Sequence, residues 1–293
     1  MYLVRTPALR ALRGQIAQTG HELATVLRGL DGLAAEREDG ARDVAVRHAR
    51  RFAFDAALAR IVDALDGYLA ALRGVDAFAE AVPALATHER SVKARLDALL
   101  EGVGVECTLE VALAHLAIQW RNRRSHTGST NRLEQRYVAK IRAAEPQLVA
   151  HARGMTAKRL LDHFEASRSP RPRELAALAR AVRESCAQAD GALVLVADPE
   201  AYATWALRSA FTVEGAAGDA PARLEQVWAQ GPDKRGGRLA QLLRERGFAE
   251  SPAAAEQGEL PDEWIDDLAH SGVREVGARL GLLEERREGR DPP

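Results

Sequence analysis

The sequence predicts an all-α or α-rich protein, with an up-and-down helical bundle followed by a smaller, mostly helical C-terminal domain. Three observations favour this fold class. The good helix formers Ala, Leu and Arg are abundant, whereas aromatic residues make up only 5% of the chain. Apolar residues recur at helical spacing through the first half of the sequence. Short turn-forming segments separate these amphipathic stretches, which is typical of sequential antiparallel helices.

Five stretches of the expected N-terminal domain, residues 1–167, share this helical periodicity. They are expected from Pro7 to about Leu33, over about 41–74 and 77–100, from Leu109 into the stretch 121–126, and from Leu133 to about Phe164. Thr6 before Pro7 matches a helix N-cap followed by a proline at the first helical position. Pro83 and Pro146 lack an amide hydrogen, so we expect them to kink or interrupt the third and fifth helices.

After residue 167 the long amphipathic stretches give way to shorter ones, and this change of pattern predicts a second domain. The segment from Ser167 to Pro172 is rich in serine, proline and arginine and is predicted to be a linker. Residues 172–293 are expected to form an accessory α-rich domain. Its short helices are expected at 173–189, 199–211, 221–229, 236–246 and 261–282. Gly191 to Val196 is apolar, and its periodicity fits a buried strand or a buried helix segment equally well.

Composition and charge exclude several classes of protein. The formal net charge is −1, so the chain as a whole does not attract polyanions. Cys107 and Cys186 lack CxxC spacing, so we expect no disulfide scaffold, no metal site and no cofactor. The N-terminus lacks the apolar segment of a signal peptide, and no apolar run is long enough to cross a bilayer. We therefore expect a cytoplasmic protein without a membrane partner.

The stretch WRNRRSHTG, from Trp120 to Gly128, opens the most basic part of the chain. Between residues 119 and 142 seven lysines and arginines face a single acid, Glu134. The basic residues are Arg121, Arg123, Arg124, Arg132, Arg136, Lys140 and Arg142. In a chain whose charges otherwise balance, this cluster indicates a local site for phosphate groups.

The pattern Arg121-Asn122-x-x-x-His126 resembles the R-x4-6-H motif of the HEPN superfamily, in the form with a polar residue after the arginine. HEPN domains are α-helical bundles in which the motif ends a long helix, and the resemblance covers roughly residues 1–165. It implies a metal-independent endoribonuclease that leaves 2′,3′-cyclic phosphate and 5′-OH ends. It further implies a role in bacterial or archaeal defence or as a toxin, with an antitoxin or defence-complex partner.

The residue types suit this chemistry. If a ribose 2′-OH attacks the neighbouring phosphorus, His126 has the pKa range to take its proton or to protonate the leaving group. Arg121 offers paired donors to the phosphate oxygens, and Asn122, four residues before His126, is placed to orient the imidazole. The expected substrate-binding residues are Arg123, Arg124, Arg132 and Arg136.

Helix geometry raises the question of how Arg121 and His126 share one site. Residues five apart on an ideal helix point about 140° away from each other. Either the helix loosens after Arg124, or two chains combine their motifs, and HEPN nucleases are similar in the second respect. We expect a homodimer with two Arg121 and two His126 facing one groove.

Two other interpretations stay open. The first is a non-catalytic helical module that uses the basic stretch 121–142 to bind nucleic acid or a protein partner. The second is a structural or regulatory helical protein. In that case Arg121 and His126 form a solvated helix end, where basic residues complement the helix dipole.

Overall fold

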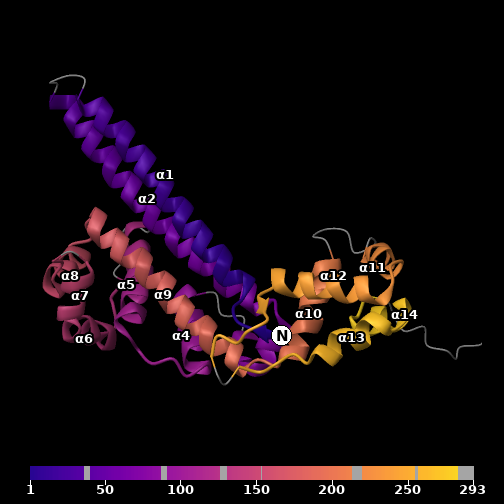
Figure 1. Ribbon diagram of the computed structural model, residues 1–293. Coiled ribbons are helices and arrows are strands. Elements are labelled where there is room, and N and C mark those ends of the chain that lie inside the picture. The colour runs from indigo at the N-terminus through magenta and orange to yellow at the C-terminus, as the bar shows by residue number, and fades with distance from the viewer. Residues whose placement is uncertain are drawn as a thin grey trace, which may run out of the picture. The chain divides into compact units, whose positions relative to one another are not determined.

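The computed structural model describes residues 1–35, 40–86, 91–125, 131–152, 154–212, 220–254 and 257–282. These residues are helical apart from turns and one two-stranded sheet, so the predicted α-rich class is confirmed (Figure 1). Within the same ranges, no helix has the length and apolar character that crossing a membrane requires.

The chain divides into two compact units whose boundaries differ from the expected domains 1–167 and 172–293. The bundle unit contains Ala8–Leu72 and Thr87–Asp190, and the terminal unit contains Met1–Pro7, Arg73–Ala86 and Gly191–Pro293. The predicted linker, Ser167 to Pro172, lies inside the bundle unit. The division falls at residues 190 and 191 within a long helix, because that helix contributes to both units.

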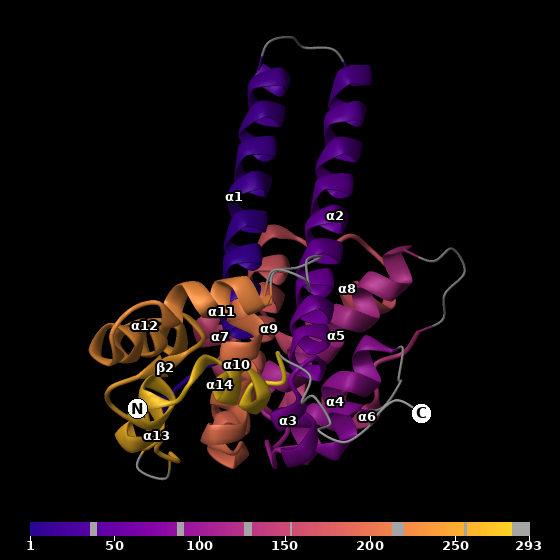
Figure 2. The ribbon, with the colours of Figure 1, turned by 90° about the vertical axis from the view of Figure 1, so that its right-hand side faces the viewer.

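The bundle unit is built from eight helices of the described chain. They are α1 (Pro7–Ala35), α2 (Gly40–Arg73), α4 (Val92–Gly102), α5 (Leu109–Ser125), α6 (Gln135–Ala143), α7 (Glu145–His151), α8 (Ala157–Glu165) and α9 (Pro172–Val196). Helix α5 is its centre, because every residue from Val111 to Trp120 is buried. A helix buried on all sides carries its apolar residues all round. Helices α1 and α2 form an antiparallel hairpin (Figures 1 and 2).

Three of the expected helices are divided in the structure, and one of them, 261–282, becomes α13 (Asp262–His270) and α14 (Val273–Arg279). The expected helix 77–100 is replaced by α3 (Asp76–Ala81), a 3-10 helix η1 (Pro83–Ala86) and α4, and residues 87–90 between them are not described. Pro83 has no amide hydrogen to continue α3. The expected fifth helix becomes α6, α7 and α8, since Pro146 lies in the first turn of α7 and Gly154, with a φ of 79°, follows that helix.

The terminal unit combines short helices with a strand pair that the sequence did not indicate. Its helices besides α3 and η1 are α10 (Pro199–Phe211), α11 (Ala220–Trp228), α12 (Pro232–Glu245), α13 (Asp262–His270) and α14 (Val273–Arg279). Strand β1 (Tyr2–Leu3) pairs antiparallel with β2 (Phe248–Ala249), with Tyr2 opposite Ala249. The apolar segment from Gly191 to Val196 is the end of α9, so the helical alternative is correct.

Aromatic rings fill the core of the terminal unit. Tyr202 stacks on Phe78 at 5.1 Å between ring centroids and lies 5.8 Å from Phe248. The indole nitrogen of Trp205 donates to the carbonyl oxygen of Gly74 at 3.0 Å. These contacts join α3, α10 and β2, and they explain why residues 73–86 pack with the C-terminal half of the chain.

Gly247 offers a test of this packing. Its φ is 109°, and a Cβ atom there would overlap the carbonyl oxygen of Arg5, next to β1. We expect Gly247→Ala to lower the free energy of unfolding by about 2 kcal/mol or more, measured by urea denaturation. Gly237→Ala is the matched control, because Gly237 lies inside α12 with open space around it. A helix-interior alanine there should raise the free energy of unfolding by up to about 1 kcal/mol. Equal effects of the two substitutions would contradict the fold.

Candidate functional site

Helix α5 ends at Ser125, so Arg121 and Asn122 lie in its last two turns. His126 lies outside the described residues. The Arg121 guanidinium pairs with Asp63 of α2 at 2.9 Å and donates to Asn122 Oδ1 at 3.3 Å. The Asp63 side chain is 63% exposed, and an ion pair that is so accessible to solvent contributes little to the stability of the fold. Arg121 is therefore held in place by contacts that a phosphate group can replace.

Arg124 is fixed much more firmly, by Asp55 of α2. Its Nε contacts both carboxylate oxygens at 3.1 Å, and its Nη2 contacts Oδ2 at 2.7 Å. This paired geometry is the strong form of a charge-assisted hydrogen bond, and it raises the pKa of Arg124. The remaining nitrogen, Nη1, donates to the carbonyl oxygen of Ser167 at 2.8 Å. Asp55 also accepts a hydrogen bond from the Ser169 hydroxyl at 2.9 Å.

The predicted linker is consequently a fixed part of the bundle unit. The buried Trp120 indole donates to the carbonyl oxygen of Arg168 at 2.8 Å. Glu174, buried in the first turn of α9, accepts from the Arg171 amide at 2.7 Å, as in a capping box. The same carboxylate lies 2.8 Å from His163 Nδ1 of α8. The segment 167–171 therefore has a defined conformation beside the end of α5.

These contacts form a cleft of about 670 Å³, which we call the arginine cleft. It is lined by Arg51, Phe54, Arg124, His163 and the segment from Ser167 to Pro172. Arg51, Arg168 and Arg171 are exposed and form no ion pair with any carboxylate in the described part of the chain. A concave surface with several unpaired guanidinium groups is suited to phosphate.

Arg123 does not face this cleft. Its side chain is only 7% exposed and donates to the carbonyl oxygens of Phe164 at 3.0 Å and Glu165 at 3.1 Å. It also pairs with the Glu165 carboxylate, bonds to the Asn131 carbonyl oxygen and lies 4.2 Å above the Phe164 ring. We therefore assign Arg123 a structural role in joining α5 to α8, instead of the expected contact with substrate. Arg132 is exposed.

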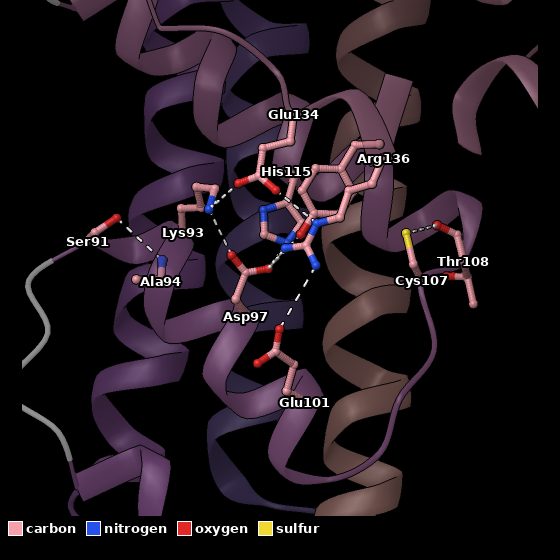
Figure 3. Close-up of polar contacts among 11 residues, drawn as sticks. Ser91, Lys93, Ala94, Asp97, Glu101, Cys107, Thr108, His115, Glu134 and Arg136 are labelled. Carbon is pink, nitrogen blue, oxygen red and sulfur yellow. Dashed lines mark hydrogen bonds and ion pairs between the residues drawn. The ribbon is translucent and has the colours of Figure 1, made fainter. Parts of the chain in front are cut away.

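Arg136 belongs to a separate network around Asp97 of α4 (Figure 3). Asp97 accepts hydrogen bonds from Tyr137 at 2.6 Å, from Arg136 at 3.0 Å and from Lys93 at 3.0 Å. Lys93 and Arg136 each reach Glu134 as well. Burial alone would raise the pKa of Asp97, but these hydrogen-bond donors hold that pKa below its usual value. Because the carboxylates balance its charge, Arg136 is a weaker candidate for binding phosphate than the cleft arginines.

His115 is the fully buried member of this network. Its ring stacks on Tyr137 at 4.1 Å, and its Nε2 lies 3.3 Å from Asp97 Oδ1. The alignment is too poor for a hydrogen bond, so neither ring nitrogen has a hydrogen-bond partner among the described residues. Burial lowers the pKa of His115 to about 4, so the ring is neutral at physiological pH. Without contact to solvent, it has a packing role.

The basic excess of residues 119–142 is thus largely neutralised by carboxylates from elsewhere in the bundle unit. Asp55 and Asp63 come from α2, Asp97 from α4 and Glu165 from α8. The arginines left exposed in a cleft lie outside that stretch, and sequence reasoning missed them. For two of them a signal was present, because Arg168 and Arg171 belong to the arginine-rich segment interpreted as a linker.

Comparisons with known proteins identify no relative. No protein-family model, no curated protein and no solved structure matches this chain. Within the described residues there is also no cluster of three His, Cys, Asp or Glu side chains that fits a metal ion. The assignment of function therefore depends on the geometry of the bundle unit.

The buried His115 predicts a specific dependence of stability on pH. Its folded-state pKa of about 4 lies below the ordinary value of 6.5, so the unfolded chain binds the proton first as the pH falls. The free energy of unfolding should therefore decrease between about pH 6.5 and pH 4, by roughly 3 kcal/mol from this residue. Urea titrations across this range measure the decrease.

His115→Phe provides the control, because the ring still stacks on Tyr137 and no longer titrates. The variant should lose that share of the pH dependence while its helical circular dichroism stays unchanged. An identical pH slope in wild type and variant would show that His115 is not buried in its neutral form.

Proposed function

We propose that this protein is a metal-independent endoribonuclease of the HEPN type, with RNA as substrate. The observation that supports the proposal most is the position of Arg121, three residues before Arg124 on the face of α5 that meets α2. Arg124 lines the arginine cleft, and His126 follows directly after the end of α5. Arg121 and Asn122 therefore lie within one helical turn of Arg124, a residue that lines the cleft.

In the proposed reaction, a ribose 2′-oxygen bonds to the adjacent phosphorus while the bond from phosphorus to the 5′-oxygen breaks. One His126 takes the 2′-OH proton, and a protonated His126, supplied by the second chain, gives a proton to the leaving 5′-oxygen. Arg121 stabilises the charge on the phosphoryl oxygens, and Asn122 positions the imidazole. The products are a 2′,3′-cyclic phosphate and a 5′-OH.

The arginine cleft gives this reaction a place for the rest of the RNA. Arg51, Arg168 and Arg171 would contact phosphates flanking the scissile bond, and the exposed Arg132 would contact others. Because the pair between Arg121 and the solvated Asp63 is weak, a scissile phosphate would replace Asp63 at little cost. Arg124 borders the cleft but keeps its bond to Asp55.

The setting of this activity is part of the same proposal. A homodimer would supply a composite active site with two motifs, which is one of the two ways in which Arg121 and His126 can share a site. A cytoplasmic role in bacterial or archaeal defence, or as a toxin held by an antitoxin or defence-complex partner, would follow from the HEPN resemblance.

A second candidate function is non-catalytic binding of nucleic acid. The arginine cleft favours it, since exposed arginines bind phosphate whether or not His126 is active. The ion pairs of Arg123, Arg124 and Arg136 argue against the whole stretch 121–142 as the binding surface. The two functions differ in whether bound RNA is cut.

Cleavage of a mixed single-stranded RNA pool in the presence of EDTA tests the nuclease. We expect wild type to cut RNA to cyclic-phosphate ends, and His126→Ala and Arg121→Ala to lower the rate by about 10² or more. His270→Ala is the matched control, because His270 is exposed at the end of α13 in the terminal unit. Equal cleavage by His126→Ala would contradict the proposal. Binding without cleavage by wild type would favour the non-catalytic function.

RNA affinity tests the cleft independently of cleavage. In the His126→Ala background, Arg168→Gln with Arg171→Gln should lower affinity for single-stranded RNA several-fold or more. It should also reduce the slope of log affinity against log salt by about one for each phosphate that the protein no longer binds. Fluorescence anisotropy at several salt concentrations measures both. Arg142→Gln with Arg238→Gln removes the same charge outside the cleft and should have little effect. The reverse ranking would place the RNA elsewhere.

A further inference from the structure

The hairpin of α1 and α2 has an apolar groove along one side. The groove holds about 310 Å³, with Leu23, Leu30, Ala49 and Ala53 among its lining residues and Val26 and Phe52 at its edges. Both views show the end of α1 and the start of α2 without a third helix of the bundle unit beside them (Figures 1 and 2). Two helices alone cannot enclose the apolar face that each presents.

The exposure of the groove is unusual for the described chain. Phe52 is 76% exposed and Val26 is 49% exposed, and both belong to the small set of large apolar residues that contact solvent. Burying a side chain of this kind is worth about 1.5–3 kcal/mol. Contiguous apolar surface of this kind marks an interaction site.

We infer that a second copy of the same hairpin covers this groove and forms a four-helix arrangement. The groove carries both halves of a self-complementary contact. Phe52 projects from it, and Ala49, Ala53 and Ala56, which line it, leave room for a large side chain. In a two-fold interface, Phe52 of each chain enters the alanine-lined part of the other.

The charges of the hairpin favour this partner. The charged residues lining the groove, Glu22 and Arg60, pair with each other across the two helices, and Asp31 pairs with Arg50 further along. Covering the groove with an apolar helix face therefore leaves neither Glu22 nor Arg60 without a partner. The groove lacks the unpaired arginines that a nucleic acid would need, in contrast to the arginine cleft.

The size of the groove sets how far the contact must extend. Its lining residues span Ala49 to Arg60 of α2, about 17 Å of helix, and two adjacent helices are about 20 Å wide. The groove alone is then about 330 Å² per chain, and the exposed Leu33 of α1 extends the apolar face beyond it, towards the roughly 500 Å² per chain of a small specific interface.

This face also leads to the candidate active site. Asp63, the partner of Arg121, follows Ala56 by seven residues and so lies on the same side of α2 as the groove. A hairpin from the second chain would therefore lie on the Arg121 side of the bundle unit. This last step rests on the proposed function, whereas the interface itself does not.

The molar mass of the full chain in solution tests the interface. Multi-angle light scattering at micromolar concentration should give twice the chain mass of 31.8 kDa for wild type. Phe52→Glu and Val26→Glu should each give the single mass. Both residues are exposed, so the variants should keep the wild-type circular dichroism. Val149→Ser, at an exposed valine of α7 outside the groove, should keep the doubled mass.

A single mass for wild type, or a doubled mass for Phe52→Glu, would overturn the inference. A monomeric Val149→Ser would do the same, because it would show that loss of any surface valine dissociates the protein. These outcomes are separate from the RNA assays. A groove-dependent dimer that cuts no RNA would leave the interface established and refute only the nuclease.

Discussion

The ion pair between Asp55 and Arg124 is the contact on which the candidate site depends. It joins the C-terminal end of α5 to the middle of α2, two segments 69 residues apart. The same two side chains hold the segment after α8, through the Ser169 hydroxyl and the Ser167 carbonyl oxygen. Without Asp55, Arg124 would be a free cation at a helix end, and the walls of the arginine cleft would lose their common anchor. The cleft is therefore a consequence of how the bundle unit packs.

Charge pairing across the bundle decides which arginines are free to act. In the sequence, residues 119–142 are strongly basic, but Arg123, Arg124 and Arg136 are each matched by a carboxylate from another helix. Arg51 lies outside that basic stretch and Arg168 and Arg171 lie in the predicted linker, yet all three line the cleft without an acidic partner among the described residues. A charge count along the chain locates the region of the site, and the fold selects the residues.

Local features were predictable from the sequence, and long-range ones were not. The starts of α1 and α7 follow from Pro7 and Pro146, because proline favours the first turn of a helix and this preference depends only on the local chain. Strand β1 is only two residues long and forms by pairing with β2, 245 residues later in the sequence. A segment this short has no periodicity from which a strand could be predicted. The segment 167–171 has the composition of a linker, but the carbonyl oxygens that fix it bond to Trp120 and Arg124, which no local pattern shows.

The proposed function requires the arginine cleft, together with the end of α5, to receive the phosphates of RNA. The decisive measurement is photo-cross-linking of a single-stranded RNA containing 4-thiouridine to the His126→Ala protein, followed by peptide mass mapping. We expect cross-links in the segments around Arg51, around Arg124 and in 167–172, which line the cleft. Cross-links confined to the terminal unit, or to the α4 and α6 segments around Asp97, would contradict this placement of the RNA.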